Sequence, residues 1–176
     1  CDTKYSYWEG DVMTLPQILE KVKSFGAKYV CVTGGEPLSQ KNTIPLMQQL
    51  LAEGYTVSLE TNGSFSIKDV PLDVIKVVDI KCPDSGESKS MAWENLSLIR
   101  KDDQFKFVVA SRRDFDWAMD IVREHKLEEK CTVLYSPAYG LVSPRDLAAW
   151  ILDAHAPVTM QVQMHKEIWG TDERGV

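Results

Sequence analysis

The sequence predicts an α/β domain built around a sheet of parallel strands. Short apolar, β-rich segments alternate with helix-period segments along the whole chain, and strands separated by helices of roughly 10 to 13 residues form right-handed βαβ units. Polar and glycine-containing sequences follow the apolar segments, as expected where a site lies at the carboxyl ends of parallel strands. Periodicity alone leaves open an open doubly wound sheet or a closed or partial barrel.

The first two elements show the pattern most clearly. A helix is expected over residues 15–25, with Thr14 as N-cap, Pro16 in the first turn and Gly26 as the stop. Its apolar side chains share one face: Leu15, Ile18, Leu19, Val22 and Phe25. Residues 28–33 form a short apolar, β-rich segment that ends in a double glycine, which is typical of a buried strand that leads into a functional loop.

The remaining elements continue this alternation. After the first strand, helices are expected at 44–53, 91–100, 114–126 and 143–154, and strands at 55–60, 75–81, 104–109, 131–135 and 158–163. A shorter connection without a helix joins strand 55–60 to strand 75–81. Five or six strand ends can therefore converge on one ligand.

Composition is consistent with one compact domain over residues 1–176. The chain is 44% hydrophobic and 26% charged, so it can bury a core and shows no sign of disorder. Its net charge of −6 argues against broad attraction to nucleic acid or an anionic membrane. The sequence contains no apolar run of about 18 residues and no signal peptide, so a cytoplasmic location is expected.

The cysteines give no zinc or disulfide pattern, because Cys1, Cys31, Cys82 and Cys131 include no CxxC pair. Cys31 and Cys131 are expected to be small core side chains in strands. A cysteine at the first position, without an initiator methionine, predicts that Cys1 is the last member of a motif that lies upstream.

Three strand ends carry residues suited to a polar ligand. Gly34-Gly35-Glu36-Pro37 lets the backbone approach a ligand closely, although an ordinary βα turn would look the same. Glu60-Thr61-Asn62-Gly63 offers groups for hydroxyls or an amino group, and Lys81 in Asp79-Ile80-Lys81 can meet a carboxylate. Taken singly, these residues could be helix caps or surface ion pairs. No GxGxxG or GxxxxGK[ST] phosphate loop is present.

These motifs resemble those of radical S-adenosylmethionine (SAM) enzymes, in which a GGEP loop follows the second barrel strand. Cys1-Asp2-Thr3, the segment from Gln161 to His165, and the terminal Arg174-Gly175-Val176 resemble the 7-carboxy-7-deazaguanine synthases in particular. The resemblance covers the whole chain and implies a radical SAM-type β/α partial barrel. The first strand, a substrate-binding segment and two cluster cysteines would lie upstream of residue 1.

The resemblance also implies three cofactors and a set of site residues. Three thiolates, Cys1 among them, would hold a [4Fe-4S] cluster, and Thr3 would bind Mg²⁺. The residues implied to contact SAM are Gly34, Gly35, Glu36, Glu60, Asn62 and Lys81. The residues implied to contact the substrate are Thr33, Gly35, Gln163, His165 and the carboxylate of Val176. No side chain is implied as an acid or base, because SAM would carry the radical chemistry.

The implied reaction is the ring contraction of 6-carboxy-5,6,7,8-tetrahydropterin to 7-carboxy-7-deazaguanine with loss of ammonia. An electron donor such as flavodoxin or ferredoxin and a homodimer are implied as partners. One alternative is an activating enzyme that places a glycyl radical on a partner protein, because such enzymes share GGEP and D-x-K. A second alternative is a non-catalytic α/β ligand-binding module, which would need no cluster.

Overall fold

The computed structural model describes residues 10–170, which contain a sheet of six parallel strands. The strands are paired in the order of the sequence, from β1 at one edge to β6 at the other. A doubly wound sheet reverses its order at a switch point, so the sequential order identifies a barrel-type sheet. The strands are β1 (Tyr29–Val32), β2 (Thr56–Thr61), β3 (Ile75–Ile80), β4 (Gln104–Val109), β5 (Thr132–Pro137) and β6 (Thr159–Met160).

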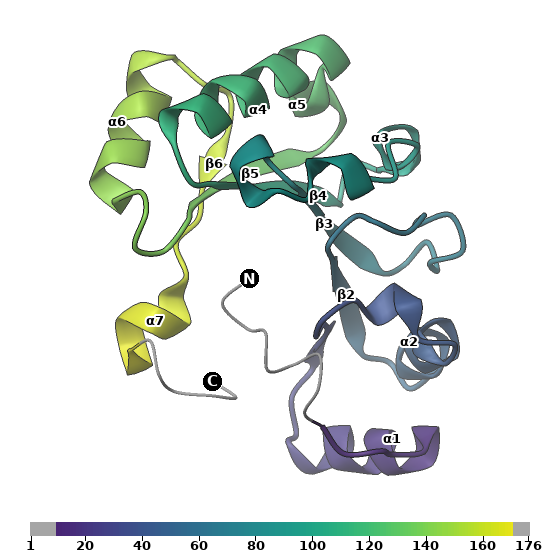
Figure 1. Ribbon diagram of the computed structural model, residues 1–176. Coiled ribbons are helices and arrows are strands. Elements are labelled where there is room, and N and C mark those ends of the chain that lie inside the picture. The colour runs from purple at the N-terminus through teal and green to yellow at the C-terminus, as the bar shows by residue number, and fades with distance from the viewer. Residues whose placement is uncertain (1–9, 171–176) are drawn as a thin grey trace.

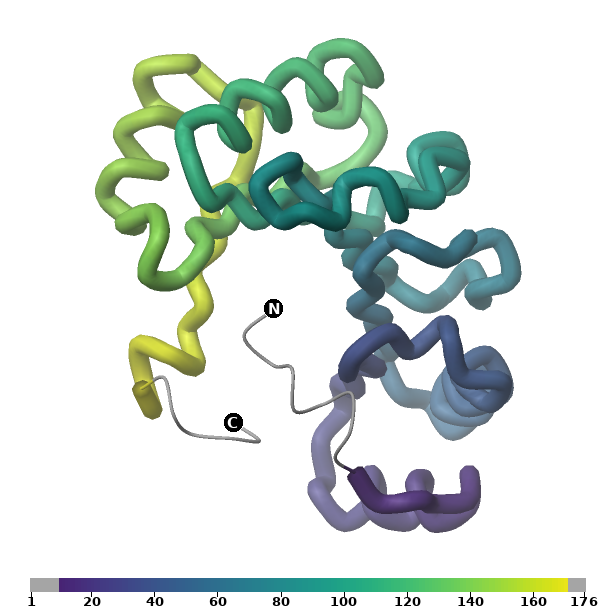
Figure 2. The backbone as a smooth tube through the Cα atoms, viewed as in Figure 1, coloured from purple at the N-terminus to yellow at the C-terminus, as the bar shows by residue number. Residues whose placement is uncertain are grey.

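The sheet curves into an open arc, and the helices cover its outer side (Figure 1). Figure 2 shows that this arc does not close within the described chain, so the fold is a partial barrel. The α-helices are α1 (Leu15–Ser24), α2 (Thr43–Ala52), α3 (Asn95–Leu98), α4 (Arg112–His125), α5 (Leu127–Lys130), α6 (Pro144–Asp153) and α7 (Met164–Trp169). Short 3-10 turns are η2 (Pro37–Ser39), η3 (Pro83–Ser85) and η4 (Ser88–Ser90). None of the helices within residues 10–170 is long and apolar enough to cross a membrane.

Alternation along the strands separates a buried outer face from a more open inner face. Because successive side chains of a strand point to opposite faces, one set packs under the helices and the other lines the inside of the arc. The outward set of the central strands is buried and includes Val57, Leu59, Val78, Ile80, Phe105, Phe107 and Val109. The inward set is half-buried or exposed and includes Ser58, Glu60, Val77, Asp79 and Lys106.

Aromatic rings fill the core between β4, β5 and the helices. The Tyr135 ring makes edge-to-face contacts with Phe107 and Phe115, at centroid distances of 5.4 and 5.7 Å. Phe115 in turn contacts Trp150 of α6. Such contacts add to the burial of apolar area, so this half of the arc is a rigid wall for whatever binds inside it.

The amino edge of the sheet holds a buried ion pair that joins β3 to the turn before β4. Lys76 Nζ lies 3.0 Å from Asp103 Oδ1 and donates to the Val74 carbonyl at 2.8 Å. The two Asp103 oxygens also accept the backbone N–H groups of Lys76 and Arg100, each at 2.9 Å. Both side chains are almost fully buried, at 4% and 3% exposed, and their polar atoms are matched.

Two of the predicted elements differ from the structure. The helix expected at 91–100 is reduced to the four-residue α3, because Met91 instead packs as a buried side chain against Gly63. The strand expected at 158–163 pairs only over Thr159–Met160. The chain then turns into α7, which the apolar pattern did not predict.

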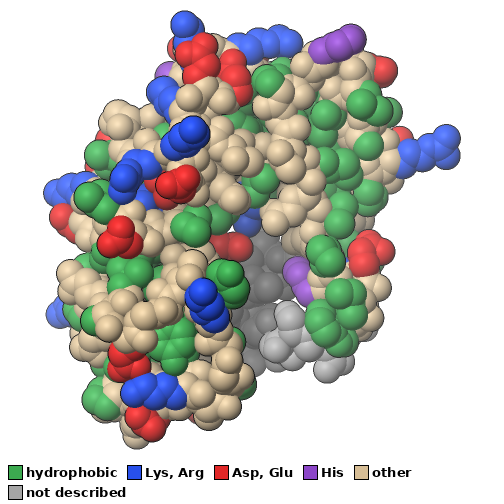
Figure 3. All heavy atoms as spheres, turned by 180° about the vertical axis from the view of Figure 1, so that it is seen from behind, with side chains coloured by type: hydrophobic (Ala, Val, Ile, Leu, Met, Phe, Trp, Pro, Cys, Tyr) green, Lys and Arg blue, Asp and Glu red, His purple; other side chains and the backbone are tan. Residues whose placement is uncertain are grey.

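The outer surface carries charged side chains of both signs interspersed with neutral ones, as Figure 3 shows for the face seen from behind. On that face no large area belongs to one sign.

Candidate functional site

The loop after β1 begins the site with an unusual backbone. Gly34 has φ +139°, a conformation that side-chain-bearing residues rarely adopt. A Cβ at this position would meet no atom within 4 Å, so the requirement for glycine is conformational. The open space beside Gly34 leaves its backbone accessible to a ligand. Thr33, which was predicted to contact the substrate, is exposed next to it.

Glu36 connects this loop to the end of β2. Its carboxylate accepts the Thr61 hydroxyl, which lies 2.9 Å from each oxygen, and the Asn62 N–H at 2.8 Å. It also accepts the Leu38 N–H at 2.9 Å as the N-cap of η2. Both oxygens are therefore used within the protein, and Glu36 holds two neighbouring loops in register.

The Asn62-Gly63 turn packs closely on the end of β3. Asn62 Oδ1 accepts the Ser64 N–H at 2.9 Å, and Gly63 has φ +75°. A Cβ on Gly63 would lie 2.6 Å from Met91 Cε and 3.0 Å from the Asp79 carbonyl oxygen. Glycine is required here for both conformation and space, and the close contact fixes the β2 loop against the strand that carries Asp79 and Lys81.

Four charged side chains gather on the inner face at the carboxyl ends of β2, β3 and β4. Lys81 Nζ lies 2.6 Å from Asp79 Oδ2, and Lys106 Nζ lies 3.2 Å from Glu60 Oε2. Glu60 is 46% exposed and Lys81 29% exposed, so both can be reached from the open side of the arc. Asp79 Oδ1 is buried and accepts no hydrogen bond from any residue within 10–170.

Cys31 lies on the same inner face as this group, and its assignment to the core was wrong. The short apolar segment around it suggested burial on both sides, but Cys31 pairs in register with Ser58 of the inner face and is exposed. The pKa of its thiol is raised, mainly by partial burial and further by the charge of Glu60. A hydrogen bond with Ser58 and the charge of Lys106 act in the opposite direction. Cys131, by contrast, is buried as predicted.

A buried carboxylate supports the loop after β3. Asp114 of α4 is fully buried, and it accepts the Asp84 N–H at 3.0 Å and the Ala110 N–H at 3.1 Å. It thereby ties the segment that follows Lys81 to the end of β4. Cys82 is also buried in this segment; desolvation, reinforced by the charges of Asp114 and Asp79, raises the pKa of its thiol far above the ordinary value. Cys82 is therefore a neutral packing group.

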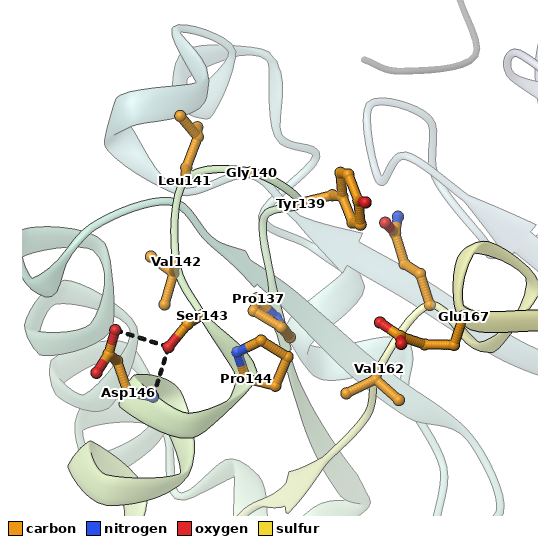
Figure 4. Close-up of a pocket in the computed structure, with 11 residues that line it drawn as sticks. Pro137, Tyr139, Gly140, Leu141, Val142, Ser143, Pro144, Asp146, Val162 and Glu167 are labelled. Carbon is orange, nitrogen blue, oxygen red and sulfur yellow. Dashed lines mark hydrogen bonds between the residues drawn. The ribbon is translucent and has the colours of Figure 1, made fainter. Parts of the chain in front are cut away.

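The predicted substrate residues near the chain end lie in a different part of the arc. Gln163 lines a pocket of about 520 Å³ between the β5–α6 loop and α7. Tyr139 and Glu167 lie on one side of this pocket and Ser143 with Asp146 on the other (Figure 4). Lys166 Nζ lies 4.6 Å from the centroid of the Tyr139 ring and so links α7 to the loop. His165 is half-buried in the first turn of α7.

Three of the predicted site residues, Cys1, Thr3 and Val176, lie outside the described residues. Within residues 10–170, no group of three or more His, Cys, Asp or Glu side chains is arranged to hold a metal ion. The predicted cluster and Mg²⁺ ligands therefore stay predictions from the sequence.

Sequence reasoning did not identify Lys106 as a site residue, and it did not recognise that Cys31 faces the inner side of the arc. The signal that could have found Lys106 is the alternation in Gln104–Val109, where the buried positions Phe105, Phe107 and Val109 place Lys106 on the opposite, inner face.

A sequential parallel arc with GGEP in the loop after β1 and polar groups at its carboxyl edge is the arrangement expected of a radical SAM domain. The family model of the radical SAM superfamily matches residues 1–77. The structure of QueE from Escherichia coli aligns with a TM-score of 0.64 at 18% identity over 85% of this chain and 64% of that chain. Streptococcus suis SuiB bound to S-adenosylmethionine aligns with a TM-score of 0.58 at 13% identity, over 88% of this chain and 44% of its own. At these identities the alignments show the fold alone. The chain spans less than two thirds of the length of either structure.

Curated relatives narrow the class to one family. The 7-carboxy-7-deazaguanine synthase of Koribacter versatilis is 39% identical over 100% of this chain and 84% of the relative. The enzyme of the same name from Chlorobaculum tepidum is 40% identical over 100% of this chain and 81% of the relative. The chain belongs to the 7-carboxy-7-deazaguanine synthase family.

Proposed function

We propose that the chain catalyses the SAM- and Mg²⁺-dependent contraction of 6-carboxy-5,6,7,8-tetrahydropterin to 7-carboxy-7-deazaguanine, with loss of ammonia. The observation that carries this proposal is the similarity to synthases along the whole chain, combined with accessible charged groups at the carboxyl edge of the arc. An open inner face lined by convergent polar groups is the arrangement expected of a small-molecule site.

The described residues suit the polar parts of SAM. The Gly34-Gly35 backbone is accessible for the methionine amino group, and Lys81 presents a cation for the carboxylate. Glu60 is exposed and can accept ribose hydroxyls, as can the Asn62 amide. Glu36 acts indirectly in this proposal, because its carboxylate holds the loops that carry these groups.

The cluster and the metal would be held by residues outside 10–170. When bound, a [4Fe-4S] cluster supplies the electron that cleaves SAM to a 5′-deoxyadenosyl radical. Cys1 would be one of its three thiolate ligands, and Thr3 would offer Mg²⁺ a hard oxygen ligand. A flavodoxin or ferredoxin as electron donor and a homodimeric enzyme belong to the same proposal.

The substrate residues proposed are Thr33, Gly35, Gln163, His165 and the Val176 carboxylate. Gln163 carries both a donor and an acceptor, which suits the N–H and carbonyl groups on the edge of a pterin. His165 lies two positions further along, beside the pocket that Gln163 lines. The β1 loop and the α7 segment would then contact the pterin from the two ends of the arc.

The experiment is anaerobic reconstitution of the full-length enzyme, followed by incubation with SAM, Mg²⁺, a reductant and the carboxy-tetrahydropterin. We expect an iron–sulfur absorbance near roughly 400 nm and a deazaguanine product identified by mass spectrometry. Replacement of Cys1 by Ala should abolish both signals. The Lys101→Met variant changes an exposed residue just before the amino end of β4 and should keep both.

Two outcomes would contradict the proposal. A cluster that cleaves SAM but leaves the pterin unchanged would favour an activating enzyme. A protein without the absorbance, after reconstitution that succeeds with a known cluster protein, would favour a binding module.

A further inference from the structure

Of the two carboxylates in the charged group, Lys106 bonds to the one on the more distant strand. Asp79 and Lys106 are register partners on the adjacent strands β3 and β4, and both point to the inner face because their neighbours Val78, Ile80, Phe105 and Phe107 are buried on the outer face. Lys106 nevertheless places Nζ 3.2 Å from Glu60 on β2, beyond the intervening strand.

The nearer carboxylate is incompletely bonded. Asp79 Oδ2 is taken by Lys81 at 2.6 Å, whereas Oδ1 is buried and has no donor among residues 10–170. An unmatched buried acceptor costs about 1–3 kcal/mol. The strand next to Asp79 therefore carries a second cation, Lys106, which is bonded to Glu60 while Asp79 Oδ1 has no donor among the described residues.

The two carboxylates differ in what else can reach them. Glu60 is 46% exposed and faces the open side of the arc, whereas the Asp79 side chain is only 15% exposed. A ligand with hydroxyl donors, such as the ribose of SAM in the proposed function, would compete with Lys106 for Glu60. The same ligand would reach the less exposed Asp79 less readily, so Asp79 Oδ1 stays open to Lys106.

We propose that Lys106 is a positioning residue with two partners: it orients Glu60 in the arrangement described above, and it moves to Asp79 Oδ1 when ligand hydroxyls engage Glu60. The move needs only side-chain rotations, because adjacent strands lie about 4.8 Å apart and the lysine side chain has four flexible carbons. This inference rests on the proposed function, since it requires SAM to engage Glu60.

The exchange leaves both carboxylates with hydrogen-bond donors. Cys31, whose thiol is sensitive to both Glu60 and Lys106, is the other titratable group that faces the lysine from β1, and it is neutral at ordinary pH because its pKa is raised. Lys81 stays on Asp79 Oδ2, Lys106 supplies the missing donor to Asp79 Oδ1, and the ligand hydroxyls take the place of Lys106 at Glu60.

The test is a set of SAM dissociation constants for the reconstituted full-length enzyme, measured by equilibrium dialysis. Lys106→Met should weaken SAM binding about tenfold, the effect expected for one charge-assisted hydrogen bond. The same change should have little effect in an Asp79→Asn background, because that background lacks the carboxylate that Lys106 is proposed to reach. In a Glu60→Gln background the effect of Lys106→Met should persist.

The controls separate positioning from folding. Lys106→Arg keeps the cation and should recover part of the lost affinity, and Lys101→Met, which removes an exposed lysine at the opposite edge, should leave the dissociation constant unchanged. Cluster content and urea unfolding of each variant show whether the fold is intact.

The opposite pattern of backgrounds would overturn the inference: an effect of Lys106→Met that persists with Asp79→Asn and vanishes with Glu60→Gln means that Lys106 stays on Glu60. An unchanged affinity in Lys106→Met would also overturn it. If the wild-type enzyme binds SAM and forms product in either case, the proposed function stands. A wild-type holoenzyme that binds no SAM would remove both.

Discussion

The two ends of β3 each carry a lysine–aspartate pair, but the pairs differ in every physical respect. At the amino end, Lys76 and Asp103 are 4% and 3% exposed and all of their polar atoms are matched. At the carboxyl end, Lys81 and Asp79 are 29% and 15% exposed, and one Asp79 oxygen has no partner within residues 10–170.

The difference separates residues that stabilise the fold from residues kept available for a ligand. A fully bonded buried pair is costly to break but offers nothing to a ligand. A partly exposed pair is expected to contribute less to the free energy of unfolding, yet its unused bonding capacity can be completed by a bound molecule. Replacements at the two ends should therefore have opposite consequences.

The largest effect on stability is expected from Lys76→Met at the amino edge. This change leaves the buried Asp103 carboxylate without its cation, and breaking a buried pair costs about 3–5 kcal/mol. Urea unfolding followed by circular dichroism measures the change, with the solvent-exposed Lys101→Met as the matched control. A loss below about 1 kcal/mol, the range of exposed pairs, would show that the buried pair is not what stabilises this edge.

A smaller loss is expected from Asp114→Asn, which tests whether burial or position in the sheet decides the role. Asp114 lies near the carboxyl edge but is fully buried, and its two oxygens accept the Asp84 and Ala110 N–H groups. An asparagine amide keeps one acceptor and sets an N–H₂ against the other donor, which costs about 1–3 kcal/mol. The same urea titration measures it.

Unchanged stability in Asp114→Asn would mean that water satisfies the donors that Asp114 now binds. Position at the carboxyl edge, and not burial, would then decide whether a residue stabilises the fold. The neighbouring exposed Asp116→Asn, which disrupts only a surface pair with Arg112, is the control and should change stability by less than about 1 kcal/mol.

The smallest effect is expected from Tyr135→Phe. The Tyr135 hydroxyl is buried without a partner among the described residues, so its removal takes away no hydrogen bond and relieves a desolvated polar group. The free energy of unfolding should stay the same or rise by up to about 1 kcal/mol. A loss above that amount, in the same urea experiment, would show that the hydroxyl is bonded in solution and that unmatched buried atoms in this fold do not identify unused bonding capacity.

Periodicity predicted most of the fold because each helix and strand has its own local signal. The capped helix at Thr14 and the apolar strands leading to Gly34 and Lys81 were found close to their observed bounds. Periodicity did not give the sequential strand order, because an apolar strand carries no record of which neighbours it pairs with; the partial barrel was implied only by the resemblance to radical SAM enzymes. Tertiary packing also overrode local pattern where Met91 fills the space beside Gly63.

The site was predictable only as far as motifs mark it. GGEP and the residues around Glu60 and Lys81 were identified by their place at strand ends, and the structure brings these loops together. The internal role of the Glu36 carboxylate and the inward turn of Lys106 depend on contacts 25 and 46 residues away in sequence. No local pattern encodes partners at that distance.

The most direct test of the contrast between the two ends of β3 is the SAM dissociation constant of Lys81→Met in the reconstituted full-length enzyme, measured together with its free energy of unfolding. We expect SAM binding at least about tenfold weaker, a loss of roughly 1.4 kcal/mol, with stability changed by less than about 1 kcal/mol. An unchanged SAM affinity combined with a large loss of stability would contradict the account, because the carboxyl end of β3 would then serve the fold and not the ligand.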